Sequence, residues 1–284
     1  CLIVAGAGSG KTKVLTSRVA HIIKEKKAWP NQILCVTFTN KAAREMQNRI
    51  SSFLNEKISS LPWLGTFHSV SAKLLRRHAE AVGLNSRFTI IDQDDQLRLI
   101  KNICKADNID IKKISPQFIL YFINRWKNDG LLPHQVTPKK GVPLEKAILN
   151  VYKYYQERLK ILNSCDFGDL ILLCVNMFEK NPDILELYLN NFKYILVDEY
   201  QDSNYIQSKW LNLLAKKNNN ICCVGDDDQS IYSWRGAEIR NFLDFSKTYK
   251  NTKIIKLEQN YRSTQNILGA ASGLIANNKD RLGK

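Results

Sequence analysis

The stretch that decides the fold is Cys1-Leu-Ile-Val-Ala-Gly-Ala-Gly-Ser-Gly-Lys-Thr12, in which an apolar run gives way to glycines and then to Lys-Thr. The apolar residues are typical of a parallel strand that is covered on both faces. The glycines let successive backbone N–H groups point into one loop, and a helix that starts there adds its positive N-terminal dipole. The sequence therefore predicts a phosphate-binding loop between a buried strand and a helix.

This loop departs at one position from the pattern G-x-x-x-x-G-K-[ST], because Ala5 stands where the first glycine is expected. In that pattern the lysine, here Lys11, reaches the β- and γ-phosphates of a nucleotide, and the hydroxyl of Thr12 binds Mg²⁺. The additional methyl group leaves these polar atoms in place, so we expect nucleotide binding. The residues expected to hold the nucleotide are Ala5, Gly6, Ala7, Gly8, Ser9, Gly10, Lys11 and Thr12.

Composition indicates a globular protein with an excess of positive charge. The 284 residues allow roughly two domains, and 42 Lys and Arg against 27 Asp and Glu give a formal charge of +15. Such a charge favours a nucleic-acid partner, although a solvated basic surface explains it as well. The seven cysteines show no C-x-x-C pair, which predicts buried reduced thiols in a cytoplasmic protein.

No apolar run approaches the roughly 20 residues that cross a bilayer, and no signal peptide is visible, so we expect no membrane partner. The chain starts at Cys1 inside an expected strand, and we therefore expect a fragment of a longer protein.

Apolar runs and helical periodicities alternate along the chain, which predicts an α/β fold with a parallel sheet. Helices are expected at 12–24 and 41–53. From 93 to 190 only helical spacing is found, which predicts an inserted helical subdomain. Its aromatic and basic residues, among them Lys112, Lys139 and Lys140, have two explanations. Either they line a nucleic-acid duct, or the aromatic residues form a core and the basic residues a solvated face. Strands are expected at 1–5, 33–38, 61–68, 88–92, 192–197, 221–224 and 253–257.

Polar and aromatic residues follow these strands, at the sheet edge where ligands of open α/β folds bind. Asp198 and Glu199 follow one strand. Asp198 is suited to hold Mg²⁺ and Glu199 to polarise the attacking water, so we expect ATP hydrolysis. Gln229 follows the next strand, where it can sense the γ-phosphate. Phe38 is either a platform for a nucleic-acid base or the last core residue of its strand. Tyr232, Trp234 and Arg235 are candidates for a grip on single-stranded nucleic acid, and Thr66 and His68 end a third strand.

Taken in order, these motifs resemble those of superfamily 1A DNA helicases of the UvrD, Rep and PcrA kind. The runs that carry the resemblance are 5–12, 37–42, 65–69, 197–202, 224–237 and 257–263. The resemblance implies a RecA-like motor domain at 1–92 and 191–284, whose tail from about 258 leads into a second motor domain, and a helical insertion at 93–190. It also implies ATP and Mg²⁺ as cofactors and 3′ to 5′ movement on single-stranded DNA, including junctions with duplex DNA. Protein partners and the DNA pathway served are not identified by it.

The resemblance also implies roles for single residues. Lys11, Glu199, Gln229 and Arg262 are expected to be catalytic, with Arg262 similar to an arginine finger, and Thr12 and Asp198 to bind the metal. Tyr261 is expected to stack on adenine, and Lys13 stands where an arginine often does so. Asp166-Phe-Gly168 spells a kinase motif, but the other kinase motifs are absent, and the run from Asp166 to Asp169 falls on an ordinary helical stretch. The residues expected along the DNA path are Phe38, Asn40, His68, Tyr232, Trp234 and Arg235.

Two alternatives remain beside a helicase of DNA repair or replication. One is the helicase subunit of a recombination nuclease complex, and the other is a nucleic-acid-binding scaffold with a vestigial ATP site. From the resemblance we expect most of the second motor domain, with its arginine finger, to lie outside this sequence, and such fingers contribute roughly 10³ to 10⁵ in rate. We therefore expect this chain by itself to bind nucleotide and DNA weakly and to hydrolyse ATP slowly.

Overall fold

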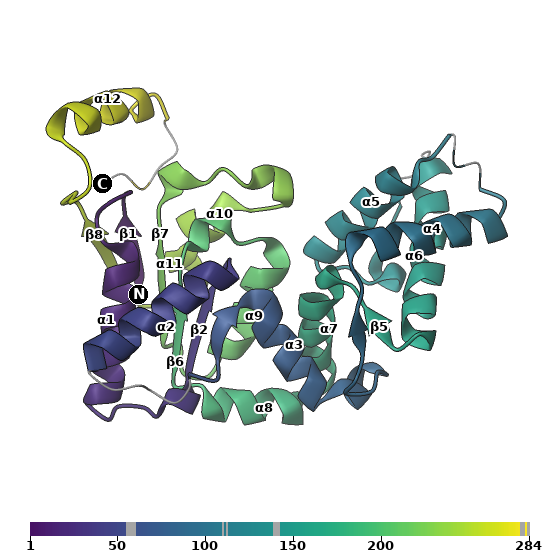
Figure 1. The fold of residues 1–284 in the computed structure, drawn as a ribbon, viewed down its shortest axis with the longest axis horizontal. Helices are drawn as coiled ribbons and strands as arrows, with labels where there is room; N and C mark the ends of the chain where they lie inside the picture. Colours follow the sequence, from purple (N-terminus) through teal and green to yellow (C-terminus); the bar gives the residue numbers. More distant parts are fainter. Residues whose placement is uncertain (55–60, 110, 112, 139–142, 279–281, 283–284) are drawn as a thin grey trace. The chain divides into compact units, whose positions relative to one another are not determined.

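A computed structural model describes residues 1–54, 61–109, 111, 113–138, 143–278 and 282 (Figure 1). The chain forms two compact units, which are described separately. The first comprises Cys1–Val70, Leu185–Asn204 and Leu211–Lys284, and the second comprises Ser71–Ile184 and Tyr205–Trp210. These bounds differ from those expected at 92 and 191, and the division into motor domain and insertion stays a prediction. Lys112, Lys139 and Lys140, considered for a nucleic-acid duct, lie outside the described residues.

The first unit is built on a six-stranded sheet in which every strand pair is parallel, as the sequence predicts. The strand order is β3-β2-β6-β7-β1-β8, so that β6, β7 and β1 are successive neighbours. Their carboxyl ends therefore meet at one edge of the sheet. The strands are β1 (Leu2–Ala5), β2 (Ile33–Thr37), β3 (Leu64–Thr66), β6 (Tyr194–Val197), β7 (Ile221–Gly225) and β8 (Ile254–Leu257).

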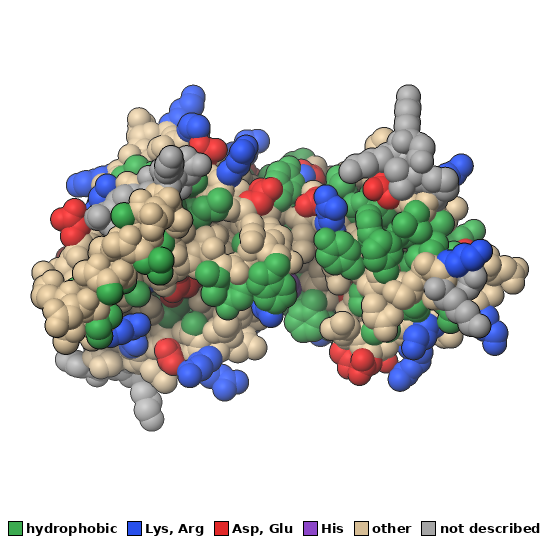
Figure 2. Space-filling view, turned by 90° about the horizontal axis from the view of Figure 1, so that it is seen from above, with side chains coloured by type: hydrophobic (Ala, Val, Ile, Leu, Met, Phe, Trp, Pro, Cys, Tyr) green, Lys and Arg blue, Asp and Glu red, His purple; other side chains and the backbone are tan. Residues whose placement is uncertain are grey.

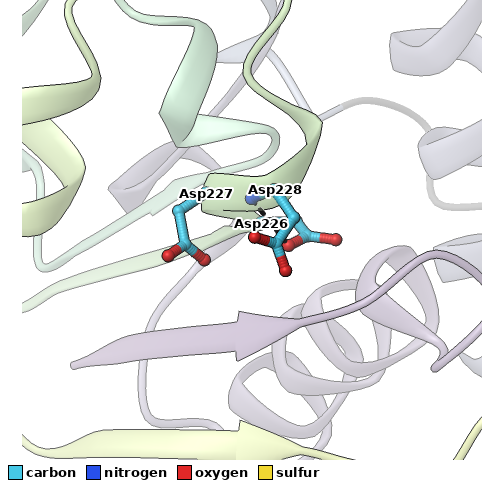
Figure 3. Close-up of side chains that lie close together, drawn as sticks. All are labelled: Asp226, Asp227 and Asp228. Atoms are coloured by element: carbon cyan, nitrogen blue, oxygen red, sulfur yellow. Dashed lines mark hydrogen bonds between the residues drawn. The ribbon is translucent and has the colours of Figure 1, made fainter. Parts of the chain in front are cut away.

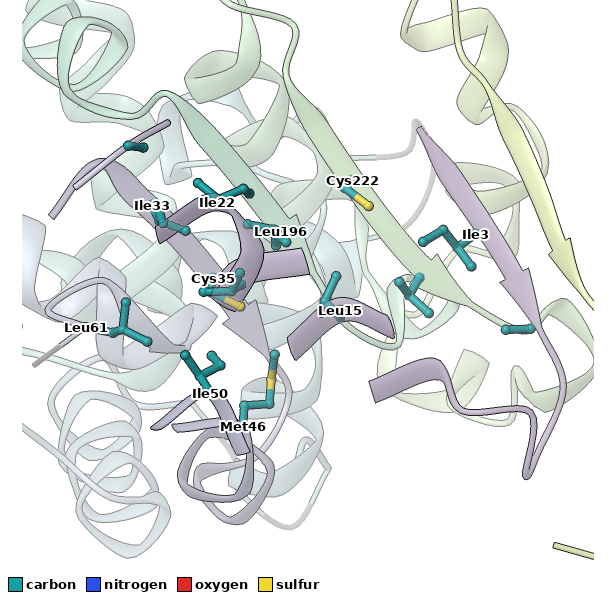
Figure 4. Close-up of a cluster of buried hydrophobic side chains, with 14 residues drawn as sticks. Ile3, Leu15, Ile22, Ile33, Cys35, Met46, Ile50, Leu61, Leu196 and Cys222 are labelled. Atoms are coloured by element: carbon teal, nitrogen blue, oxygen red, sulfur yellow. The ribbon is translucent and has the colours of Figure 1, made fainter. Parts of the chain in front are cut away.

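Helices α1 (Lys11–Lys24) and α2 (Asn40–Leu54) cover one face of this sheet (Figure 4). Leu15 of α1 and Met46 of α2 are completely buried in one cluster with inward-facing strand residues such as Leu196. Burying a side chain of this size stabilises the fold by about 1.5–3 kcal/mol. The remaining helices of this unit are α8 (Pro182–Asn191), which begins at the end of the second unit, α10 (Ile239–Leu243), α11 (Phe245–Thr248) and α12 (Gln265–Ile275).

The second unit is mainly helical, as expected, with a separate core that includes Ile100, Ile119 and Tyr155. The expected strand at 88–92 is only Thr89–Ile90 (β4), and it pairs with β5 (Ser164–Cys165) in a small sheet rather than with the main one. Its helices are α4 (Gln93–Ala106), α5 (Pro116–Asn128), α6 (Pro143–Ile161) and α7 (Phe167–Lys180), together with most of α3 (Phe67–Arg77); α9 (Tyr205–Ala215) belongs to it up to Trp210.

Lys127 lies completely buried in the second unit, between two aspartates. Its Nζ lies 2.6 Å from Asp166 Oδ2 and 2.8 Å from Asp169 Oδ1, and the hydroxyl of Tyr155 donates to Asp166 at 2.8 Å. Asp166 and Asp169 also form the capping box of α7, in which each side chain accepts the other's backbone N–H. The Asp166–Asp169 stretch is therefore not an ordinary helical segment, because it anchors a buried ion-pair cluster.

The seven cysteines are all described and are free thiols, six of them buried. None of the described helices combines the length and the apolar character needed to cross a membrane. On the face shown in Figure 2, Lys and Arg side chains stand at separate positions among hydrophobic and uncharged groups rather than in one basic stripe.

Candidate nucleotide and nucleic-acid site

The loop between β1 and α1 has the backbone that its glycines predict. Gly8 and Gly10 have φ values of 76° and 92°, a region that favours glycine, and Gly10 is the N-cap of α1. A Cβ on Gly8 would lie 2.6 Å from the Cβ of Arg262, so this position needs glycine for space as well. Ala5 is the fully buried last residue of β1, which explains why a methyl group is accepted at the first position of the pattern.

Lys11 brings together two residues that lie far from it in the sequence. Its Nζ is 2.9 Å from Glu199 Oε2 and 3.2 Å from Gln229 Oε1. Because β1, β6 and β7 are neighbours in a parallel sheet, the residues that follow them meet at one edge. Three of the four residues expected to be catalytic are thus in direct contact, and the fourth, Arg262, lies against Gly8 of the loop.

The two carboxylates after β6 occupy different environments. Asp198 is 3% exposed, and burial, reinforced by the adjacent Glu199 carboxylate, raises its pKa to about 6. Glu199 is half-buried and has a φ of 50°, which is unusual for a residue other than glycine. Nearby, burial and Glu199 also raise the pKa of Asp202 to about 6. The site therefore holds more negative charge than Lys11 neutralises.

An open hollow of about 360 Å³ joins these groups to candidate nucleic-acid residues of the first unit. Thr12 and Asp198, the two expected metal ligands, both line it, and their side chains carry a hydroxyl and a carboxylate. Oxygen donors of this kind are those that Mg²⁺ prefers. The lining residues are Thr12, Thr37, Phe38, Thr39, Ala42, Glu45, Asp198, Glu199, Gln201, Asp202, Gln229, Ile231 and Tyr232.

Three consecutive aspartates, Asp226, Asp227 and Asp228, follow β7 with ligand atoms within 4.8 Å of one another (Figure 3). Three of these carboxylate oxygens, two of Asp226 and one of Asp227, accept hydrogen bonds within the chain. Asp226 accepts the side-chain amide of Gln229 and the backbone N–H of Asp228, and Asp227 accepts the backbone N–H of Leu282 at 2.7 Å. The hydrogen bonds of Asp226 to Asp228 and Gln229 therefore hold the loop after β7 in shape.

The aromatic and basic residues after this loop form a compact exposed group. Trp234 is 71% exposed, and the guanidinium of Arg235 lies 4.6 Å from the centre of its ring and 5.4 Å from that of Tyr232. Phe38 is half-buried and makes an edge contact of 5.4 Å with Phe67, so it is a core neighbour and also lines the hollow. The group has the aromatic and cationic surface that stacks on nucleic-acid bases.

The other expected residues are placed as follows. His68 lies in the first turn of α3 and not on a strand, because β3 ends at Thr66, and burial lowers the pKa of its imidazole. Asn40 is the exposed first residue of α2, and Lys13 is exposed on α1. Tyr261 is 80% exposed, and its backbone N–H donates to Gly8 O at 2.9 Å.

The sequence did not single out two further residues. The side-chain amide of Asn260 donates to Ala7 O, which fastens the segment of Tyr261 and Arg262 to the phosphate-binding loop. Gln201 is a buried residue of the loop that follows β6, and its side chain reaches the loop that follows β7. Both residues lie inside runs that carry the family resemblance. Only their contacts show that Asn260 fastens a segment to the phosphate-binding loop and that Gln201 links the loops after β6 and β7.

The comparison with known proteins agrees with this geometry. A sequence model of the UvrD/REP helicase N-terminal domain matches residues 1–250. This chain belongs to the UvrD/REP helicase family. A probable DNA helicase II homolog of Rickettsia felis is 53% identical over the whole chain, which covers 43% of that relative. ATP-dependent DNA helicase PcrA of Leuconostoc citreum is 47% identical over the whole chain, and PcrA of Staphylococcus aureus is 46% identical over 99% of it.

Membership of the UvrD/REP helicase family confirms the resemblance inferred from the motifs and the RecA-like fold class. The chain spans less than half the length of these relatives, 43% of the Rickettsia felis protein and 38% of the two PcrA proteins. The roles of the individual site residues remain predictions.

Proposed function

We propose that this chain is the nucleotide-binding part of an ATP-dependent DNA helicase that moves 3′ to 5′ on single-stranded DNA and engages junctions with duplex DNA. The observation that carries the proposal is the single hollow shared by Thr12, the carboxylates after β6, Gln229 and the aromatic residues Phe38 and Tyr232. Relatives named DNA helicase II and PcrA support it. A cytoplasmic location and a role in DNA repair or replication belong to the same proposal.

Lys11 provides the first step of the proposed chemistry. Its Nζ is held by Glu199 and Gln229. An incoming phosphate replaces both partners, because it offers more negative charge to the same ammonium group. Glu199 is then able to accept a proton from the attacking water, and Gln229 to contact the γ-phosphate.

Thr12 and Asp198 would hold Mg²⁺, since both residues line the same hollow and carry side-chain oxygens. The ion would neutralise charge on the phosphates. Asp198, with its pKa raised to about 6, is mostly ionised at pH 7 and is able to serve as its ligand. Tyr261, whose backbone is bound to Gly8 of the loop, and Lys13 of α1 would contact the base of the nucleotide.

The central test uses the full-length protein and measures DNA-stimulated ATP hydrolysis and unwinding of 3′-tailed duplexes. Lys11→Ala and Glu199→Gln are each expected to lower kcat by about 10²–10³-fold, the usual loss for a group that stabilises transition-state charge. Lys24→Ala, at the other end of α1, is the matched control. Unwinding that persists in Lys11→Ala would rule out the proposal, and DNA binding without hydrolysis in the unmutated protein would favour the scaffold alternative.

The DNA half of the proposal is tested by Trp234→Ala. Loss of one stacked base weakens single-stranded DNA binding by about 1–3 kcal/mol, or roughly 5- to 150-fold. Trp29 is the matched control, because it is also 71% exposed but lies before β2. Fluorescence anisotropy with labelled oligonucleotides measures the effect. A loss of nucleotide affinity in Trp234→Ala, with DNA affinity unchanged, would contradict the assignment.

A further inference from the structure

Gln201 is a buried glutamine whose two polar ends reach two different loops of the site. It is 1% exposed, its Nε2 donates to Glu199 Oε2 at 2.9 Å, and its Oε1 accepts the backbone N–H of Asp226 at 3.0 Å. Glu199 follows β6 and Asp226 follows β7, which are neighbouring strands. The side chain therefore ties the two loops together across the sheet edge.

Gly225, the last residue of β7, leaves the space that this side chain occupies. A Cβ at this position would lie 2.5 Å from Gln201 Oε1 and 2.6 Å from a ring carbon of Phe242. The φ of Gly225 is not positive, so its conformation does not require glycine. The reason for glycine here is therefore the close approach of Gln201 and Phe242.

The contacts of Gln201 complete a closed ring of hydrogen bonds. Lys11 donates to Glu199 and to Gln229, and Gln229 donates to the carboxylate of Asp226, whose N–H is bound by Gln201. Glu199, with its unfavourable positive φ, is the member of the ring whose backbone needs support. Gln201 supplies a fixed donor to one of its carboxylate oxygens.

We propose that Gln201 is a positioning residue that holds the carboxylate of Glu199 for water activation and links it to the loop that carries Gln229 and leads to Tyr232 and Trp234. The inference rests on the proposed function. A shift of Glu199 when phosphate takes Lys11 is transmitted by Gln201 to the backbone at Asp226. The same residue thus couples the nucleotide site to the exposed aromatic group.

The test compares two variants of the full-length protein that preserve the size of the side chain. Gln201→Met removes both polar ends, and Gln201→Glu keeps the acceptor for Asp226 but replaces the donor to Glu199 with a carboxylate. Each is expected to lower the kcat of DNA-stimulated ATP hydrolysis by about 10-fold or more, with the KM for ATP within about 3-fold of the unmutated value, because an interaction that orients the catalytic group acts on kcat.

The pH dependence separates positioning from simple support of the fold. A protonated glutamate donates a hydrogen bond as the amide does, so the kcat of Gln201→Glu relative to the unmutated protein is expected to rise as the pH falls from 8 to 6. The carboxylates in contact with this position are those of Glu199 and Asp202, and Lys11 opposes them through its ion pair with Glu199; Asp226 offers its backbone N–H. Gln201→Met has no such group, so its relative kcat should stay constant over this range.

Two further variants complete the design. Gly225→Ala should displace Gln201 and give a similar loss in kcat, and combining it with Gln201→Met should add little, because both changes break one linkage. Gln96→Met, a buried glutamine of α4 in the helical unit, is the control and should leave kcat unchanged. If the unmutated protein hydrolyses ATP and Gln201→Met and Gln201→Glu match it in kcat, the inference is wrong while the proposed function stands. An unmutated full-length protein that is inactive would overturn the proposed function itself.

Discussion

Two lysine–carboxylate clusters in this chain differ in their contact with solvent. Lys127 and its partners Asp166 and Asp169 are at most 1% exposed, whereas Lys11 pairs with Glu199, whose side chain is 35% exposed. Glu199 also lines an open hollow. The described residues bury the Lys127 cluster away from solvent, and with it from other anions, whereas Glu199 of the Lys11 pair borders the hollow. The comparison shows that exposure decides whether such a pair is a permanent link or an exchangeable one.

The largest effect is expected from Lys127→Met. It leaves two carboxylates buried without a cation, which should lower the free energy of unfolding by about 3–5 kcal/mol. Lys11→Met is the matched control, because the half-exposed Glu199 stays hydrated, and it should change stability by less than about 1 kcal/mol. Urea unfolding of both variants measures the difference. Equal losses would show that the two clusters do not differ as proposed.

Asp169→Asn is expected to change the pH dependence of stability. Burial, reinforced by Asp166, raises the pKa of Asp169 to about 6, so the folded protein holds this proton more tightly than the unfolded chain. The stability that this group contributes is fully present below about pH 4 and is lost as the pH rises through 6. The free energy of unfolding, relative to that of Asp169→Asn, should therefore fall by about 1–3 kcal/mol between pH 4 and pH 7.

Asp166 contributes in the opposite direction, since Lys127, working against burial, holds its pKa below the ordinary value. Asp166 is present in both proteins, so the comparison with Asp169→Asn reports the contribution of Asp169 together with its coupling to Asp166. Urea unfolding at pH 4, 5, 6 and 7 provides the measurement. A relative stability that rises with pH would contradict the assignment of the raised pKa to Asp169.

The smallest effect concerns the exchangeable pair. Glu199→Gln removes the ion pair that a phosphate must replace, which is worth about 1 kcal/mol for a partly exposed pair, so ATP should bind about 5-fold more tightly while hydrolysis falls. Fluorescence titration with a labelled ATP analogue measures the affinity. Glu238→Gln, an exposed residue after the aromatic group, is the control. Weaker ATP binding in Glu199→Gln would mean that Glu199 does not compete for Lys11.

Sequence patterns located the elements of the first unit within a few residues, because strand and helix formation there follows local periodicity. The strand at 33–38 is observed as Ile33–Thr37, and the helix at 41–53 as Asn40–Leu54. The strand expected at 61–68 was too long, and His68 therefore lies on a helix. Local apolar character does not show where hydrogen bonding to β2 ends, since only the neighbouring strand decides this.

The strand expected at 88–92 illustrates a second limit. Its apolar residues gave no sign of which strand it joins, and its partner, β5, is more than 70 residues away in the sequence. Similarly, Asp166 belonged to a misleading short motif, and the link of Asp166 and Asp169 to Lys127 depends on packing between α5 and α7. Pairings between distant segments leave little trace in the local pattern.

By itself the sequence determined the phosphate-binding loop, the parallel α/β class, the carboxylates after β6 and the family, because each depends on residue types at fixed spacing. Only the tertiary structure decided that Lys11 contacts Glu199 and Gln229, which are 188 and 218 residues away, and that Gln201 joins their loops. The physical reason is strand order: β6, β7 and β1 are neighbours in the sheet but not in the chain. The same strand order places Lys11, with its exchangeable ion pair, at an open edge of the sheet. Packing of the helical unit buries Lys127, whose ion pairs are permanent.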